Sequence, residues 1–120
     1  MTDASIGRGD VVICVFSNEF GKPRPAVVVQ SDLFNETHAT VVLCPVSSEI
    51  TGLAMFRVPI PASASTGLRT DSEVMTDKIS TVGRPRIRKQ VGKLSNSQME
   101  LVDRAIRTWL DLTDSRGSNP

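Results

Sequence analysis

Short runs of apolar, mostly β-branched residues alternate with polar turns over the first two thirds of the chain. This pattern predicts strands over 11–16, 26–30, 40–46, 55–60 and 76–82, and a short helical turn over 31–36. The polar segment 17–25 separates the first two strands, which we expect to pair as a hairpin with a long loop. Pro59 lies inside the fourth strand and predicts that this strand is at a sheet edge.

Helical periodicity is clear only near the end of the chain. Ser97 and Glu100 fit a capping box, and apolar residues then recur at helical spacing at Met99, Val102, Ile106 and Trp109. We expect this stripe, Trp109 included, to be buried in core or dimer packing. The pattern predicts one domain over 1–120, with flexible tails at 1–7 and 113–120. Its fold class is mostly β (α+β), a small SH3-like or barrel-like antiparallel sheet with a C-terminal helix.

The composition agrees with a single globular domain. The 120 residues are 39% hydrophobic and 22% charged, which is enough apolar material for one core. No run approaches the roughly 18 consecutive apolar residues of a membrane span, and residues 1–5 lack the features of a signal peptide, so we expect a cytoplasmic protein with no membrane partner. Cys14 and Cys44 lie in apolar runs without a metal-ligand spacing, so we expect buried, reduced thiols and no metal or cofactor.

Charge is distributed unevenly, although the formal net charge is only +1. The segment 84–93 carries five cationic residues and no acidic one, which is compatible with a positive patch and also with a solvated strand edge. Asp77 shares a face with Met75 and Ile79 if 76–82 is a strand, and a carboxylate on such an apolar face needs a partner.

The most constrained charges precede prolines. Lys22 comes before Pro23 and Arg24 before Pro25, and this context restricts the backbone of both cationic residues. The Arg24 side chain therefore starts from a fixed position at the entry to an apolar strand. Phosphate binding and a structural ion pair with a carboxylate both fit this arrangement.

Four segments, in this order and spacing, carry a family resemblance: 8–12 (Arg-Gly-Asp-Val-Val), 21–29, 45–48 (Pro-Val-Ser-Ser) and 74–81. With the helix that follows, the chain resembles toxins of the MazF/PemK type. The resemblance implies the CcdB/MazF-type fold and a type II toxin–antitoxin toxin that inhibits translation. Its activity would be metal-independent, sequence-specific cleavage of single-stranded RNA, which leaves 2′,3′-cyclic phosphate and 5′-hydroxyl ends.

The resemblance also implies a homodimer without a cofactor, and an antitoxin whose disordered, acidic segment competes with RNA for the same surface. It assigns Arg24, Ser47 and Glu19 to catalysis: Arg24 to stabilise the charged phosphate, Ser47 to donate to a phosphate oxygen, and Glu19 as a base or a partner of Arg24. The residues expected to bind RNA are Lys22, Phe20, Ser48, Asp77, Lys78 and Arg86. The chain departs from the family pattern at Lys78 and Ser80.

Other functions and residue roles also fit the sequence. A CcdB-like DNA gyrase poison shares the fold and uses a C-terminal tryptophan, which Trp109 could provide, and a non-catalytic RNA- or protein-binding module would also fit. Asp77 could serve an RNA pocket or pair with a cation such as Arg86. His38, the only histidine, lies outside the resembling segments and is expected to be structural.

Overall fold

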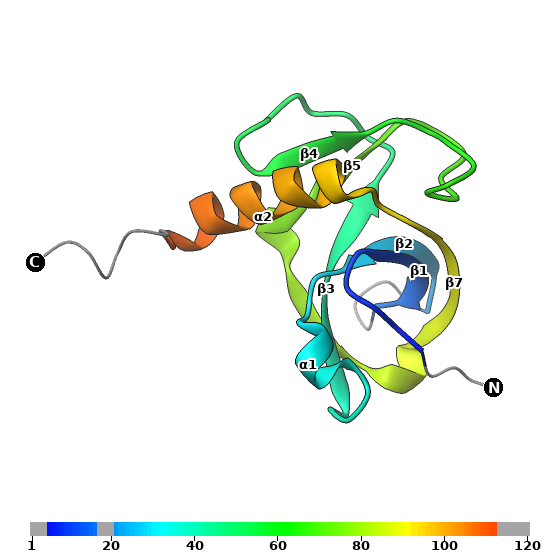
Figure 1. Ribbon diagram of the computed structural model, residues 1–120. Helices are drawn as coiled ribbons and strands as arrows, with labels where there is room; N and C mark the ends of the chain where they lie inside the picture. The colour runs from blue at the N-terminus through cyan, green and yellow to red at the C-terminus, as the bar shows by residue number, and fades with distance from the viewer. Residues whose placement is uncertain (1–4, 17–20, 113–120) are drawn as a thin grey trace, which may run out of the picture.

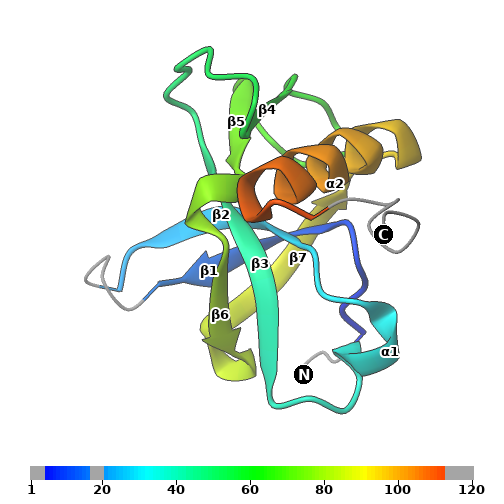
Figure 2. The ribbon, with the colours of Figure 1, turned by 90° about the vertical axis from the view of Figure 1, so that its left-hand side faces the viewer.

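The computed structural model describes residues 5–16 and 21–112, in which seven antiparallel strands form one sheet. The strands run in the order β4-β5-β3-β2-β1-β7, and β6 pairs separately with β3. Figure 1 and Figure 2 show how the sheet curls, with α2 across one end and α1 at the other. The strands are β1 (Asp10–Val15), β2 (Pro23–Val28), β3 (Thr40–Ser47), β4 (Arg57–Ile60), β5 (Ser72–Met75), β6 (Ser80–Gly83) and β7 (Ile87–Lys93).

The predicted hairpin is confirmed, since β1 and β2 pair antiparallel with Cys14 opposite Arg24. The predicted edge position of the fourth strand is also confirmed, because β4 stands at one end of the strand order and, among the described strands, pairs with β5 alone. The bounds of the second strand are wrong at both ends: β2 begins at Pro23 and ends at Val28, so Arg24 is part of a strand and not of the loop. The prolines are tolerated because strand pairing with β3 starts only at Ala26.

The strand predicted over 76–82 is confirmed only in its second half, as β6 (Ser80–Gly83). A 3₁₀ turn, η2 (Thr76–Lys78), separates β5 from β6. Thr76 fixes this turn, because both its backbone N–H and its Oγ1 hydroxyl donate to the carbonyl oxygen of Phe56, at 3.1 and 2.7 Å. Asp77 therefore lies on a turn, and the alternation that placed it beside Met75 and Ile79 does not apply.

Both faces of the central strands are buried, which explains their continuous apolar runs. On β1, Val11 belongs to one buried cluster and Val12 to another. The two cysteines are buried and free, as expected. Burial raises the pKa of the Cys14 thiol to about 11 and that of Cys44 to about 12.

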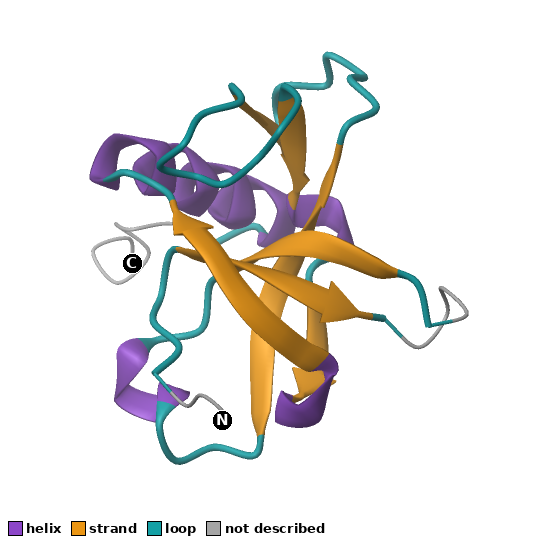
Figure 3. Cartoon of the chain, turned by 90° about the vertical axis from the view of Figure 1, so that its right-hand side faces the viewer, coloured by secondary structure: helices purple, strands orange, loops and turns teal. Residues whose placement is uncertain are grey.

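The helix α2 (Asn96–Leu110) packs against η2 and β4 and buries Val102 and Ala105. Figure 3 shows it along one end of the sheet. The predicted cap was misplaced by two residues, because the N-cap is Ser95 and its capping-box partner is Gln98. The expected burial of Trp109 in the core is wrong: the residue is 47% exposed in the single chain, and its ring is tilted by 48° against Phe56, with ring centroids 5.2 Å apart. Its burial in dimer packing stays a prediction.

The predicted helical turn is confirmed as α1 (Asp32–Asn35). Part of the expected N-terminal tail is held in place: Ile6 packs against a core cluster, and the Gly7 N–H donates to Asp10 Oδ2 at 2.8 Å. Within 5–16 and 21–112, no helix is long and apolar enough to span a bilayer.

Candidate active site

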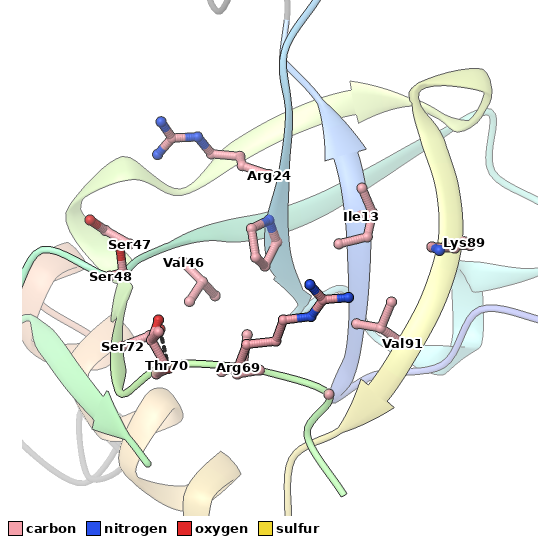
Figure 4. Close-up of a pocket in the computed structure, with 13 residues that line it drawn as sticks. Ile13, Arg24, Val46, Ser47, Ser48, Arg69, Thr70, Ser72, Lys89 and Val91 are labelled. Atoms are coloured by element: carbon pink, nitrogen blue, oxygen red, sulfur yellow. Dashed lines mark hydrogen bonds between the residues drawn. The ribbon is translucent and has the colours of Figure 1, made fainter. Parts of the chain in front are cut away.

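The sheet divides at β3, and this division creates a pocket. β3 pairs with β2 as far as Pro45, opposite Ala26, and then pairs with β5 from Val46 onward. The first half of β2 and the last residues of β3 therefore separate and leave a pocket of about 620 Å³ between them (Figure 4). It is lined by Ile13, Arg24, Pro25, Val46, Ser47, Ser48, Gly67, Leu68, Arg69, Thr70, Ser72, Lys89 and Val91.

Two residues assigned to catalysis, Arg24 and Ser47, line this one pocket from opposite sides of the division. Arg24 is partly buried on β2, and Ser47 is the last residue of β3. Ser47 Oγ accepts a hydrogen bond from the Glu49 N–H at 3.0 Å. Since Oγ is the acceptor there, its O–H remains a donor for a ligand. Arg24 and Ser47 thus offer a charged fork and a hydroxyl donor, a suitable pair for a phosphate group.

The loop after Ser47 is anchored by a buried carboxylate. Glu73 is opposite Ser47 in the β3–β5 register and is only 2% exposed. It accepts hydrogen bonds from the Thr51 N–H and Oγ1 and from the Gly52 N–H, at 2.9–3.1 Å. Burial by itself would raise the pKa of Glu73, but these hydrogen bonds and the charge of Arg57 lower it overall. The loop that follows the Ser47–Ser48 end of the pocket is thereby fixed to β5.

Asp77 pairs with Arg57 and not with Arg86, which corrects the partner suggested by the sequence. Arg57 Nε and Nη2 donate to the two carboxylate oxygens of Asp77 at 2.7 and 3.1 Å. These bonds hold the pKa of Asp77 below its usual value and raise that of Arg57. Arg86 instead donates to the Val15 carbonyl oxygen at 3.5 Å. Asp77 does not line the pocket, so its contacts are those of a structural ion pair.

Other residues expected to bind RNA lie apart from the pocket lining. Lys22 is exposed just before β2, Lys78 is exposed on η2, and Arg86 is exposed on a second 3₁₀ turn, η3 (Arg84–Arg86). Ser48 lines the pocket beside Ser47. Glu19 and Phe20 are outside the described residues.

The sequence did not predict three of the polar lining residues, Arg69, Thr70 and Ser72. They belong to the end of a small-residue loop and the start of β5, where no periodic pattern marks a face. Lys89 was visible only as part of a basic run. All four residues reach the pocket through tertiary structure, which local sequence does not show. The pairing of β3 with β5 and of β1 with β7 brings them there.

Among residues 5–16 and 21–112, no three His, Cys, Asp or Glu side chains are grouped as metal ligands would be. His38 is exposed, and its backbone carbonyl accepts from Arg84 Nε at 2.7 Å.

A curled antiparallel sheet with one C-terminal helix and a cationic, hydroxyl-lined pocket defines a small, mostly β protein built to bind an anionic ligand. The family model for PemK-like, MazF-like toxins of type II toxin–antitoxin systems matches residues 7–110. The chain therefore belongs to this toxin family.

Relatives from sequence and structure agree with this assignment. The chain is 35% identical over 106 residues to the "Probable endoribonuclease MazF" of Mycolicibacterium smegmatis, covering 88% of this chain and 96% of the relative. It is 30% identical over 100 residues to endoribonuclease MazF9 of Mycobacterium tuberculosis, covering 79% and 84%. The solved structure of M. tuberculosis toxin MazF-mt6 superposes with a TM-score of 0.76 at 26% identity, covering 87% of this chain and 98% of that one.

Proposed function

We propose that the pocket is where this MazF-type toxin endoribonuclease cleaves single-stranded RNA. The observation that carries the proposal is the meeting of Arg24 and Ser47 in one pocket, from two strands that diverge there. A phosphodiester placed between them contacts a guanidinium on one side and a hydroxyl on the other.

The reaction joins the 2′-oxygen to the adjacent phosphorus and breaks the bond from phosphorus to the 5′-oxygen. The products are a 2′,3′-cyclic phosphate and a 5′-hydroxyl. Negative charge on the non-bridging oxygens rises in the transition state, where the fixed charge of Arg24 and the O–H of Ser47 stabilise it. One proton leaves the 2′-hydroxyl and another is delivered to the 5′-oxygen. Glu19 is the proposed base, or the residue that orients Arg24.

The proposed assembly follows the family. The toxin acts as a homodimer in the cytoplasm, and its cognate antitoxin inhibits it. A solved mycobacterial endoribonuclease in complex with its cognate antitoxin has this fold, with a TM-score of 0.77 at 21% identity. The positive charge of the pocket suits an acidic antitoxin segment as well as RNA, so antitoxin and substrate would compete.

The test is incubation of the purified protein with a long single-stranded RNA in EDTA, followed by mapping of new 5′ ends. We expect discrete cuts with 5′-hydroxyl ends from the unaltered protein and none from Arg24→Ala. The matched control is Arg104→Ala, because Arg104 is exposed on α2 and outside the pocket lining. Intact RNA from folded, antitoxin-free protein would refute the proposal, and gyrase inhibition would then be measured. Undiminished cutting by Arg24→Ala would refute the role of Arg24.

A further inference from the structure

The pocket holds more positive charge than one phosphate group requires. Its lining includes Arg24, Arg69 and Lys89, and no carboxylate among the described residues. Asp71, which lies two residues after Arg69 in the sequence, accepts a hydrogen bond from the Ala62 N–H at 2.9 Å. The extra cations are therefore not neutralised by an acidic side chain of the pocket wall.

These cations lie at two ends of the pocket. Figure 4 shows the Arg24 guanidinium on the side of Ser47, whereas the Arg69 guanidinium is on the side of Ile13 and Val91. Lys89 comes from β7, the strand that also carries Val91. A ligand that contacts both ends must be longer than a single phosphodiester group, as a nucleic-acid strand is.

Arg69 is exposed, but the loop that carries it is fixed to β7. The Lys93 N–H donates to the Ser65 carbonyl oxygen at 2.9 Å. The backbones also touch: a Cβ added to Gly67 would lie 2.3 Å from the Val91 carbonyl oxygen, and one added to Gly92 would lie 2.2 Å from the Thr66 carbonyl carbon. Such close approach is possible only with glycine at these two positions. The backbone that carries Arg69 is therefore held beside β7, the strand that carries Lys89.

We propose that Arg69 and Lys89 form a second phosphate subsite, which binds a phosphate of the RNA strand other than the scissile one. This inference rests on the proposed function of the pocket. Each nucleotide of a single strand brings one further phosphate, so a strand with its scissile group at Arg24 and Ser47 extends its next phosphates along the pocket. The subsite contributes to affinity and to the register of the strand, and it takes no part in bond breaking.

The experiment uses an RNA that spans the mapped cut and carries one 2′-deoxy nucleotide where the attacking hydroxyl would be. Its binding is measured by fluorescence anisotropy over a range of KCl concentrations for the unaltered protein, Arg69→Ala, Lys89→Ala and the double variant. For single strands, each lost phosphate contact lowers the slope of log affinity against log salt by about 0.7. Because the two residues share one phosphate, we expect a decrease of about 0.7 for the double variant and a smaller decrease for each single variant.

A second measurement locates the phosphate. Neutral methylphosphonate linkages are introduced one at a time on either side of the cut. At one position the substitution should weaken binding of the unaltered protein several-fold and have no further effect on the double variant. In cleavage assays, the same variants should raise KM while leaving kcat within about twofold, in contrast to Arg24→Ala.

Arg104→Ala is the charge-matched control, with the same loss of one cation outside the pocket. If the unaltered protein cuts RNA and the Arg69 and Lys89 variants have the salt slope and KM of the Arg104→Ala control, the subsite is refuted and the proposed function stands. If no methylphosphonate position distinguishes the unaltered protein from the double variant, the subsite is also refuted. RNA left intact by the unaltered protein would overturn both proposals.

Discussion

Replacement of Arg57 by leucine tests the buried ion-pair network beside the pocket. The Arg57 side chain is 13% exposed and forms two hydrogen bonds with Asp77, and its Nη1 lies 3.9 Å from Glu73 Oε1. Removal of the guanidinium leaves two carboxylates without their cation, at 13% and 2% side-chain exposure. Loss of one partner of a buried pair typically costs 3–5 kcal/mol. Because Asp77 keeps some contact with solvent, we expect a loss of about 3 kcal/mol in the free energy of unfolding.

The loss should depend on pH, and its sign follows from the pKa shifts. The pKa values of Asp77 and Glu73 are lowered in the folded protein. Each group therefore contributes stability above its unfolded pKa, near 4, and this contribution disappears as the pH falls through the folded value. Without Arg57, Asp77 loses the largest cause of its lowered pKa, whereas Glu73 keeps the hydrogen bonds from Thr51 and Gly52. The difference between the unaltered protein and Arg57→Leu should be largest at pH 7 and shrink below about pH 4.

The assay is urea unfolding followed by circular dichroism, at one protein concentration, because a dimer would make stability depend on concentration. Arg104→Leu is the control for loss of an exposed arginine. A double-mutant cycle of Arg57→Leu and Asp77→Asn should give a coupling energy of about 1–3 kcal/mol between the two residues. A loss below about 1 kcal/mol at pH 7, or a difference that does not change with pH, would show that this network is not stabilising.

Two further predictions concern backbone positions. Gly92→Ala should lower the free energy of unfolding by about 2 kcal/mol, because its Cβ would lie 2.2 Å from the Thr66 carbonyl carbon and the loop must move; an unchanged urea midpoint would contradict this close contact. Ser95→Ala should lower the free energy of unfolding by about 1 kcal/mol through loss of the helix cap, whereas Ser97→Ala should lower it by less than half of that. Equal losses for the two serine variants, measured by the same unfolding assay, would contradict the assignment of Ser95 as the N-cap.

The sequence was most informative where one local pattern decides the structure. The runs around Val12 and Val42 form buried strands, and the family segments identified Arg24 and Ser47 before any contact between them was known. Their meeting in one pocket depends on the change of partner by β3, which no local pattern encodes.

Two of the errors have the same cause, a contact between distant segments. Thr76 bonds to the carbonyl of Phe56, twenty residues away, and this turns the chain where alternation predicted a strand. Asp77 finds Arg57 through the same turn, whereas the nearer basic run suggested Arg86. Trp109 continues the helical stripe in sequence, but it lies at the end of α2, where it is 47% exposed and its ring contacts Phe56.

The prolines of β2 have a consequence for how a protein inhibitor reaches the pocket. Between Pro23 and Pro25 the strand pairs with β1 alone, and its other side is a free edge among the described residues. A peptide usually joins such an edge as an added strand, through main-chain hydrogen bonds. Neither proline has an N–H to offer, so an added strand would find no donor at either position, although both carbonyl oxygens can still accept. An inhibitory segment at this pocket therefore gains less from main-chain hydrogen bonds along this edge and depends more on its side chains.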